Sequence, residues 1–107
     1  MRMRVMINTP INDLPAGEVV VRVFVEDTSR IDDAAAPVAE STTSVEELQS
    51  SIPVEITCRE PTAEESFSVR VHVDVNGSGQ VELGDLVSTA AHCAIDGDIQ
   101  VPLSRVG

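Results

Sequence analysis

The chain alternates apolar and polar residues with a period of two in four separate stretches. Every odd position from 19 to 25 is valine, and the same alternation returns in residues 52–58, 69–76 and 99–103. Residues two apart point to the same face of a strand, whereas a helix would spread them around its circumference. β-Branched residues dominate the apolar positions, as strand packing favours. Each stretch is therefore predicted to be a half-buried β-strand.

Weaker strand candidates and turn-forming residues fill the rest of the chain. The candidates are residues 5–9, 37–43 and 80–83, and the turn clusters are 14–17, 27–36, 60–62 and 96–98. About seven strands at this spacing are typical of an antiparallel β-sandwich. Pro53 and Pro102 cannot donate to a strand ladder and indicate edge strands. The predicted inward-facing residues are Val19, Val21, Val23, Val25, Ile52, Val54, Ile56, Val69, Val71, Val73, Ile99 and Val101.

Two segments are candidates for short helices. Ser44-Val45-Glu46-Glu47 has the spacing of a capping box, in which Ser44 and Glu47 bond each other's backbone N–H. Residues 85–95 place apolar side chains at helical spacing, with Asp85 as the N-cap. The rest of the chain is expected to be all-β.

Composition limits the possible functions. The chain has 107 residues, 42% of them apolar, which suits one folded domain over residues 1–107. Its formal charge is −11, and its aromatic residues are Phe24 and Phe67. Such a chain repels phosphate and lacks stacking platforms, so nucleic-acid binding is excluded. Because we find neither an apolar run of the ~20 residues that span a bilayer nor a signal peptide, we expect a soluble protein, cytoplasmic unless a signal peptide precedes it.

The cysteines and histidines do not form a recognisable site. Cys58 and Cys93 are expected to be free thiols, Cys58 as a small apolar filler at the end of an inward series. His72 lies between charged neighbours on a polar strand face and is predicted to be solvated. His92 and Cys93 are adjacent, so on a strand they point to opposite faces.

Enzyme signatures are also missing from the sequence. It contains no nucleophile elbow, no Walker or dinucleotide glycine motif, and no His and Cys pair at zinc spacing. We therefore predict that the protein is not an enzyme and has no catalytic, cofactor-binding or metal-binding residue. A small hydrolase that uses His72 or His92 is the alternative.

One segment, from Asp74 to Asp85, has the donor spacing of a calcium loop. Oxygen donors occupy alternate positions, with a glycine for the sharp turn and an acidic residue at the end. The donors are Asp74, Asn76, Ser78, Gln80, Glu82 and Asp85, and the glycine is Gly79. However, the preceding stretch alternates as a strand instead of a helix, and Asn76-Gly77 is a strong hairpin signal. We predict a hairpin that folds without calcium, with a calcium-binding adhesion or docking module as the alternative.

Almost the whole chain resembles the YscW/YbaY-type lipoprotein domain family. Residues 14–40 read LPAGEVVVRVFVEDTSRIDDAAAPVAE, which has the family's Leu-Pro, Gly, valine-rich strand, Asp-x-Ser turn, Pro-Val and Ala-Glu in order. IPVEIT (52–57), VRVHVDVNGSGQVELGD (69–85) and VPLSRV (101–106) follow at the family's approximate spacing. The departures are the REPTAEES link before Phe67 and the lack of the family's lipid-bearing N-terminal cysteine and signal peptide.

The resemblance implies a β-sandwich in which the glycine-rich turn joins two strands, and a non-catalytic role. Members of the family include a type III secretion pilotin, which escorts an outer-membrane secretin, and periplasmic lipoproteins. We therefore predict a protein-interaction or chaperone-like, pilotin-like module whose partner is another protein. The resemblance assigns no functional residue to this chain.

Overall fold

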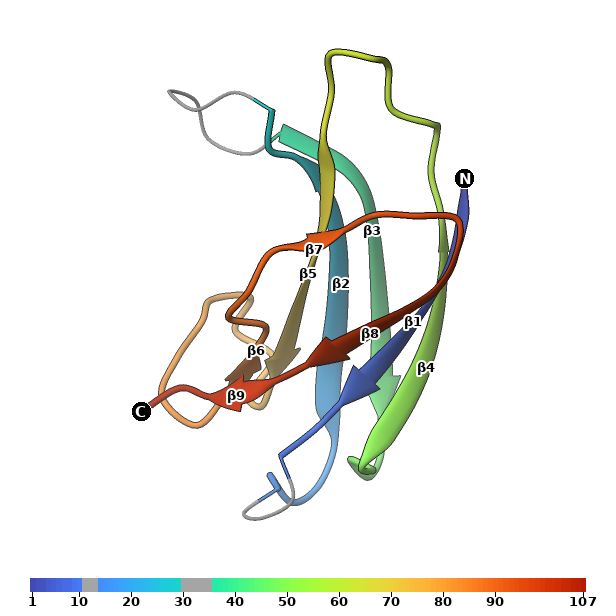
Figure 1. Cartoon of the computed structure of the whole chain (residues 1–107). Coiled ribbons are helices and arrows are strands. Elements are labelled where there is room, and N and C mark those ends of the chain that lie inside the picture. Colours follow the sequence, from blue (N-terminus) through green and yellow to red (C-terminus); the bar gives the residue numbers. More distant parts are fainter. Residues whose placement is uncertain (11–13, 30–35) are drawn as a thin grey trace.

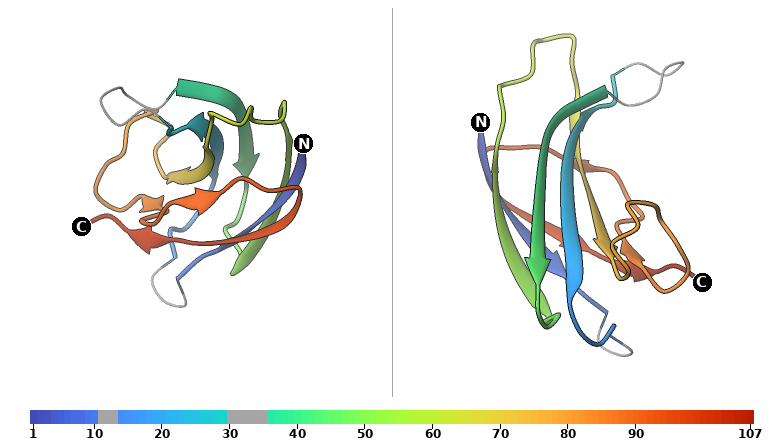
Figure 2. Two further views of the ribbon diagram at one scale, coloured as in Figure 1. Left: turned by 45° about the horizontal axis from the view of Figure 1, so that its top comes forward. Right: turned by 180° about the vertical axis from the view of Figure 1, so that it is seen from behind.

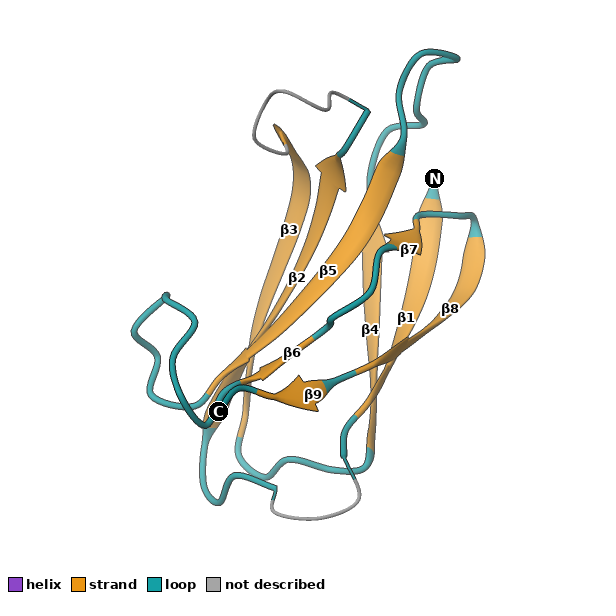
Figure 3. Ribbon diagram, turned by 60° about the vertical axis from the view of Figure 1, so that its left-hand side comes forward, coloured by secondary structure: helices purple, strands orange, loops and turns teal. Residues whose placement is uncertain are grey.

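The computed structural model describes residues 1–10, 14–29 and 36–107, and these residues form β-strands and no helix. The strands are β1 (Arg2–Asn8), β2 (Val19–Asp27), β3 (Ala36–Val45), β4 (Ser51–Thr57), β5 (Phe67–Asp74), β6 (Leu86–Val87), β7 (His92–Cys93), β8 (Gly97–Pro102) and β9 (Ser104–Arg105). Figures 1 and 3 show them as two sheets joined by loops. The predicted all-β sandwich is confirmed. None of the described segments is a helix able to span a bilayer.

The sandwich has a three-stranded sheet in the order β4-β1-β8 and a six-stranded sheet in the order β3-β2-β5-β6-β9, with β7 also paired to β5. β8 and β9 form one continuous run that leaves the first sheet and enters the second, with Leu103 between them (Figure 2). Neighbouring strands are antiparallel except β1 and β8, which run parallel. Both edges of the three-stranded sheet, β4 and β8, carry the prolines that predicted edge strands, Pro53 and Pro102.

The core lies between the sheets and contains most of the predicted inward residues. Ile52 and Val54 are half-buried because β4 is an edge strand, whereas the other predicted core residues are buried. β1 contributes more than its weak pattern predicted, since it begins at Arg2 and forms the centre of its sheet. Core residues missing from the prediction are Met3, Val5, Ile7, Leu48, Phe67, Leu86 and Leu103.

Both helix candidates are wrong. Within residues 85–95 the chain forms β6 and β7, which pair with β5 instead of winding into a helix. Backbone pairing with β5 satisfies N–H and C=O groups of these two short strands that a helix would otherwise have used. Ser44 and Val45 belong to β3, and Glu46 and Glu47 form the bend that follows it.

Glu65, in the loop between β4 and β5, is expected to titrate far below an ordinary glutamate. Two 2.7 Å hydrogen bonds from Arg59, with a further one from the Thr62 N–H, lower the pKa of Glu65 from 4.5 to about 2. The contribution of the Arg59–Glu65 contact to the stability of the fold is therefore present above the unfolded pKa of Glu65 and is lost as the pH falls through about 2. NMR titration of the Glu65 carboxyl carbon measures this midpoint. Arg59→Met is expected to raise it, and a wild-type midpoint near the ordinary value would contradict the ion pair.

Candidate functional site

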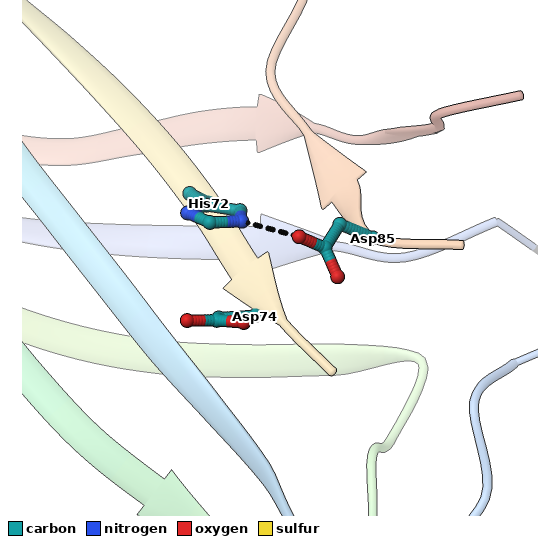
Figure 4. Close-up of side chains that lie close together, drawn as sticks. All are labelled: His72, Asp74 and Asp85. Atoms are coloured by element: carbon teal, nitrogen blue, oxygen red, sulfur yellow. Dashed lines mark hydrogen bonds and ion pairs between the residues drawn. The ribbon is translucent and has the colours of Figure 1, made fainter. Parts of the chain in front are cut away.

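Three side chains with metal-binding and acid–base chemistry meet next to the loop of residues 75–85 (Figure 4). His72 and Asp74 lie on β5, on the opposite face from the core residues Val71 and Val73, and Asp85 precedes β6. The outer face of a sheet is normally solvated, yet His72, Asp74 and Asp85 are only 2%, 0% and 1% exposed. They are buried because the backbone of this loop folds back against them, as the hydrogen bonds below show.

The Asp85 carboxylate is hydrogen-bonded both to His72 and to backbone N–H groups of the loop. Its Oδ2 atom lies 2.8 Å from His72 Nε2 and accepts the Glu82 N–H at 3.1 Å. Its Oδ1 atom accepts the Val75 N–H at 3.0 Å. This one carboxylate therefore ties both ends of the loop to β5.

Asp74 holds the middle of the loop. Its Oδ1 and Oδ2 atoms accept the N–H groups of Gly77 and Gly79 at 3.0 and 2.8 Å. Gly79 has a φ of 83°, a backbone conformation that glycine adopts without the penalty of a Cβ atom. On the sheet side, Arg22 Nη2 lies 3.3 Å from Asp74 Oδ2, while the buried Arg22 Nε atom has no hydrogen-bond partner.

Both carboxyl groups are ionised at neutral pH. Burial raises the pKa of Asp85, but hydrogen bonds from His72 and from the backbone outweigh burial and leave that pKa below 3.8. Burial likewise raises the pKa of Asp74, and the Gly79 N–H and Arg22 more than compensate. The cluster therefore holds two negative charges on side chains that are buried from the surface.

This arrangement is suited to fixing the loop through buried charged side chains. Because the three side chains are buried, a substrate does not reach them. Acid–base catalysis requires the catalytic group to reach the substrate within hydrogen-bond distance. Two hollows on the described surface are lined by other groups, Arg59 and Glu65 in one and Val69 and Ala90 in the other. His92 lies on β7 beside the exposed Cys93, and both cysteines are free thiols.

The structure corrects several predictions about this region. His72 is not solvated, because the loop covers the polar face of β5. β5 and β6 do form an antiparallel hairpin, but the connection is the whole loop, so a two-residue turn at Asn76-Gly77 and a strand at 80–83 are wrong.

Asp74 and Asp85, the first and last donors of the calcium pattern, do lie close together. Other donors of the calcium pattern bond within the exposed part of the loop, Asn76 Nδ2 to Glu82 at 2.7 Å and Ser78 Oγ to the Gln80 carbonyl at 3.2 Å. The contact between His72 and Asp85 has no signal in the local sequence, since its partners are 13 residues apart on different elements.

Comparisons with known proteins establish the fold class: the chain shares its fold with a pilotin of a bacterial secretion system. The similar structure is described as an alternative pilotin from the type II secretion system of Vibrio cholerae. The match has a TM-score of 0.76 at 16% sequence identity and covers 100% of this chain and 97% of the other. No family model and no curated protein matches the sequence.

Proposed function

We propose that the chain is a non-catalytic, pilotin-like module that binds a protein of a secretion system. The observation that carries this proposal is the likeness to the type II secretion pilotin over the full length of both chains. The proposal agrees with what the resemblance of the sequence to the YscW/YbaY-type family implies. The buried cluster agrees with a role that needs no substrate access.

We further propose that β3 is the binding edge. It is the outermost strand of its sheet, ten residues long, with Thr42, Thr43 and Ser44 exposed. An exposed strand edge binds an extended segment of another protein through main-chain hydrogen bonds. By contrast, the free edge of β4 in the other sheet carries Pro53, which has no N–H to offer.

The strand register identifies which backbone groups of β3 face outwards. Val71 of β5 bonds to Ser88, on the side away from β2. Because N–H groups alternate along a strand, the even residues of β5 and β2 face each other and the odd residues of β2 face β3. Val21 is odd and pairs with Thr43, so the N–H of the neighbouring Thr42 points to the free edge.

The negative charge near β3 indicates the kind of segment that this edge binds. Glu40 lies exposed on β3, Glu46 follows the strand, and the whole chain carries a formal charge of −11. A basic segment is therefore attracted to this edge, with an association rate that falls as salt is added.

The test is titration of the ¹⁵N-labelled protein with the soluble part of the secretin from the same secretion system. Shifts are expected along β3, and Thr42→Pro should weaken binding about tenfold or more by removing an intermolecular hydrogen bond. Thr42→Val keeps the N–H and is the matched control. Equal affinity of the proline variant and the wild type would exclude the β3 edge, and lack of any secretin binding would exclude the proposed function.

A further inference from the structure

We propose that His72, Asp74 and Asp85 bind one divalent transition-metal ion, for which zinc is the best fit. One ligand atom from each residue lies within 4.8 Å of the others, and Figure 4 shows the three side chains close together. An imidazole nitrogen with two carboxylate oxygens is a donor set that zinc accepts, whereas calcium takes oxygen ligands. His72 therefore changes the metal suggested by the loop spacing from calcium to zinc.

The hydrogen bonds around the two carboxylates leave a place for the ion. A carboxylate oxygen has two lone pairs, so it can accept a backbone N–H and still coordinate a metal. At Asp85 Oδ2 the backbone donor is Glu82 and the side-chain donor is His72. At Asp74 Oδ2 the corresponding donors are Gly79 and Arg22. A metal ion would replace only the two side-chain contacts, so the backbone of the loop need not change.

Charge balance favours the same site. Two buried carboxylates require compensating positive charge. At Asp74, Arg22 supplies it weakly, since its 3.3 Å contact is longer than the ~2.7–2.9 Å of a strong charge-assisted hydrogen bond and its Nε atom has no partner. The Arg22 side chain is 21% exposed and can turn outwards. A dication between Asp74 and Asp85 would neutralise both carboxylates at once.

The ion would be structural. The cluster is closed to substrates, and its ligands come from β5 and from the residue before β6, so bound metal would cross-link the two ends of the loop. Such binding couples directly to folding stability. This inference is independent of the partner-binding proposal, because the β3 edge contains none of the three ligands.

The test uses a background variant with the substitutions Cys58→Ser, His92→Gln and Cys93→Ser, which removes the other cysteine and histidine side chains that could bind zinc. At neutral pH we expect it to bind one equivalent of Zn²⁺ by calorimetry with a Kd of about 1 μM or tighter. Co²⁺ should give the absorption bands of a low-coordinate site. An excess of zinc about 100 times the Kd should raise the melting temperature by roughly 10 °C or more.

Two further variants in this background separate the site from non-specific binding. His72→Gln should weaken zinc binding about a hundredfold, while Arg22→Gln, which removes the competing cation, should strengthen it. If the background variant binds no stoichiometric zinc, or if His72→Gln retains its affinity, the proposal is overturned. Stabilisation by calcium without zinc binding would overturn it in favour of an all-oxygen site.

Discussion

Asp85→Ala is expected to lower the free energy of unfolding by about 3 kcal/mol or more, because it removes a buried acceptor that serves three donors and each unsatisfied donor costs about 1–3 kcal/mol. The substitution leaves His72 and the N–H groups of Val75 and Glu82 without their acceptor. Each buried donor that loses its partner bears the cost of desolvation without a compensating bond. Urea denaturation in the presence of a chelator measures the loss without a contribution from metal.

The matched control for this variant is Asp98→Ala. Asp98 is an exposed aspartate on β8, so its removal should change the stability by about 0.5 kcal/mol or less. If Asp85→Ala costs no more than this control, Asp85 does not hold the loop in the way the distances indicate.

Ile7→Ala is expected to cost about 2–5 kcal/mol, because it opens a cavity in the core. Ile7 is 0% exposed on β1, the central strand of its sheet, and pairs with Ile52 on one side and Val101 on the other. For a domain of this size each kcal/mol lowers the melting temperature by about 4–8 °C, so thermal denaturation resolves the effect clearly.

Ile95→Ala is the same chemical change at a surface position. Ile95 is 53% exposed, and its truncation should leave the melting temperature within a few degrees of the wild type. Equal losses for the two variants would mean that β1 is not the packed centre of its sheet.

The sequence predicted those elements whose side chains carry a two-residue period over several residues. β2 is the clearest case, since its odd valines are buried and its even residues are not. Sequence patterns failed where pairing with a distant strand decides the conformation. Leu86 and Val87 belong to a segment whose apolar residues have helical spacing, yet they pair with β5 as a strand.

The candidate site shows the same difference between local patterns, which the sequence reports, and long-range contacts, which it does not. The spacing of oxygen donors singled out the loop from Asp74 to Asp85, whose two ends do lie close together. It did not predict the burial of His72, since a polar face with Arg70 and Asp74 on either side is normally solvated. Tertiary coverage by a loop is a property of the whole fold, so residue alternation does not report it.

The parallel pairing of β1 with β8 also affects how the chain folds during synthesis. β1 ends at Asn8 and β8 begins at Gly97, so the three-stranded sheet is complete only after the long segment between these strands is available. At ribosomal rates of about 5–20 residues per second, the interval between these strands is roughly 5–20 s. For that time the backbone edge of β1 that pairs with β8 has no permanent partner. The nascent protein therefore passes through a period in which its earliest strand is open to chaperones and to aggregation.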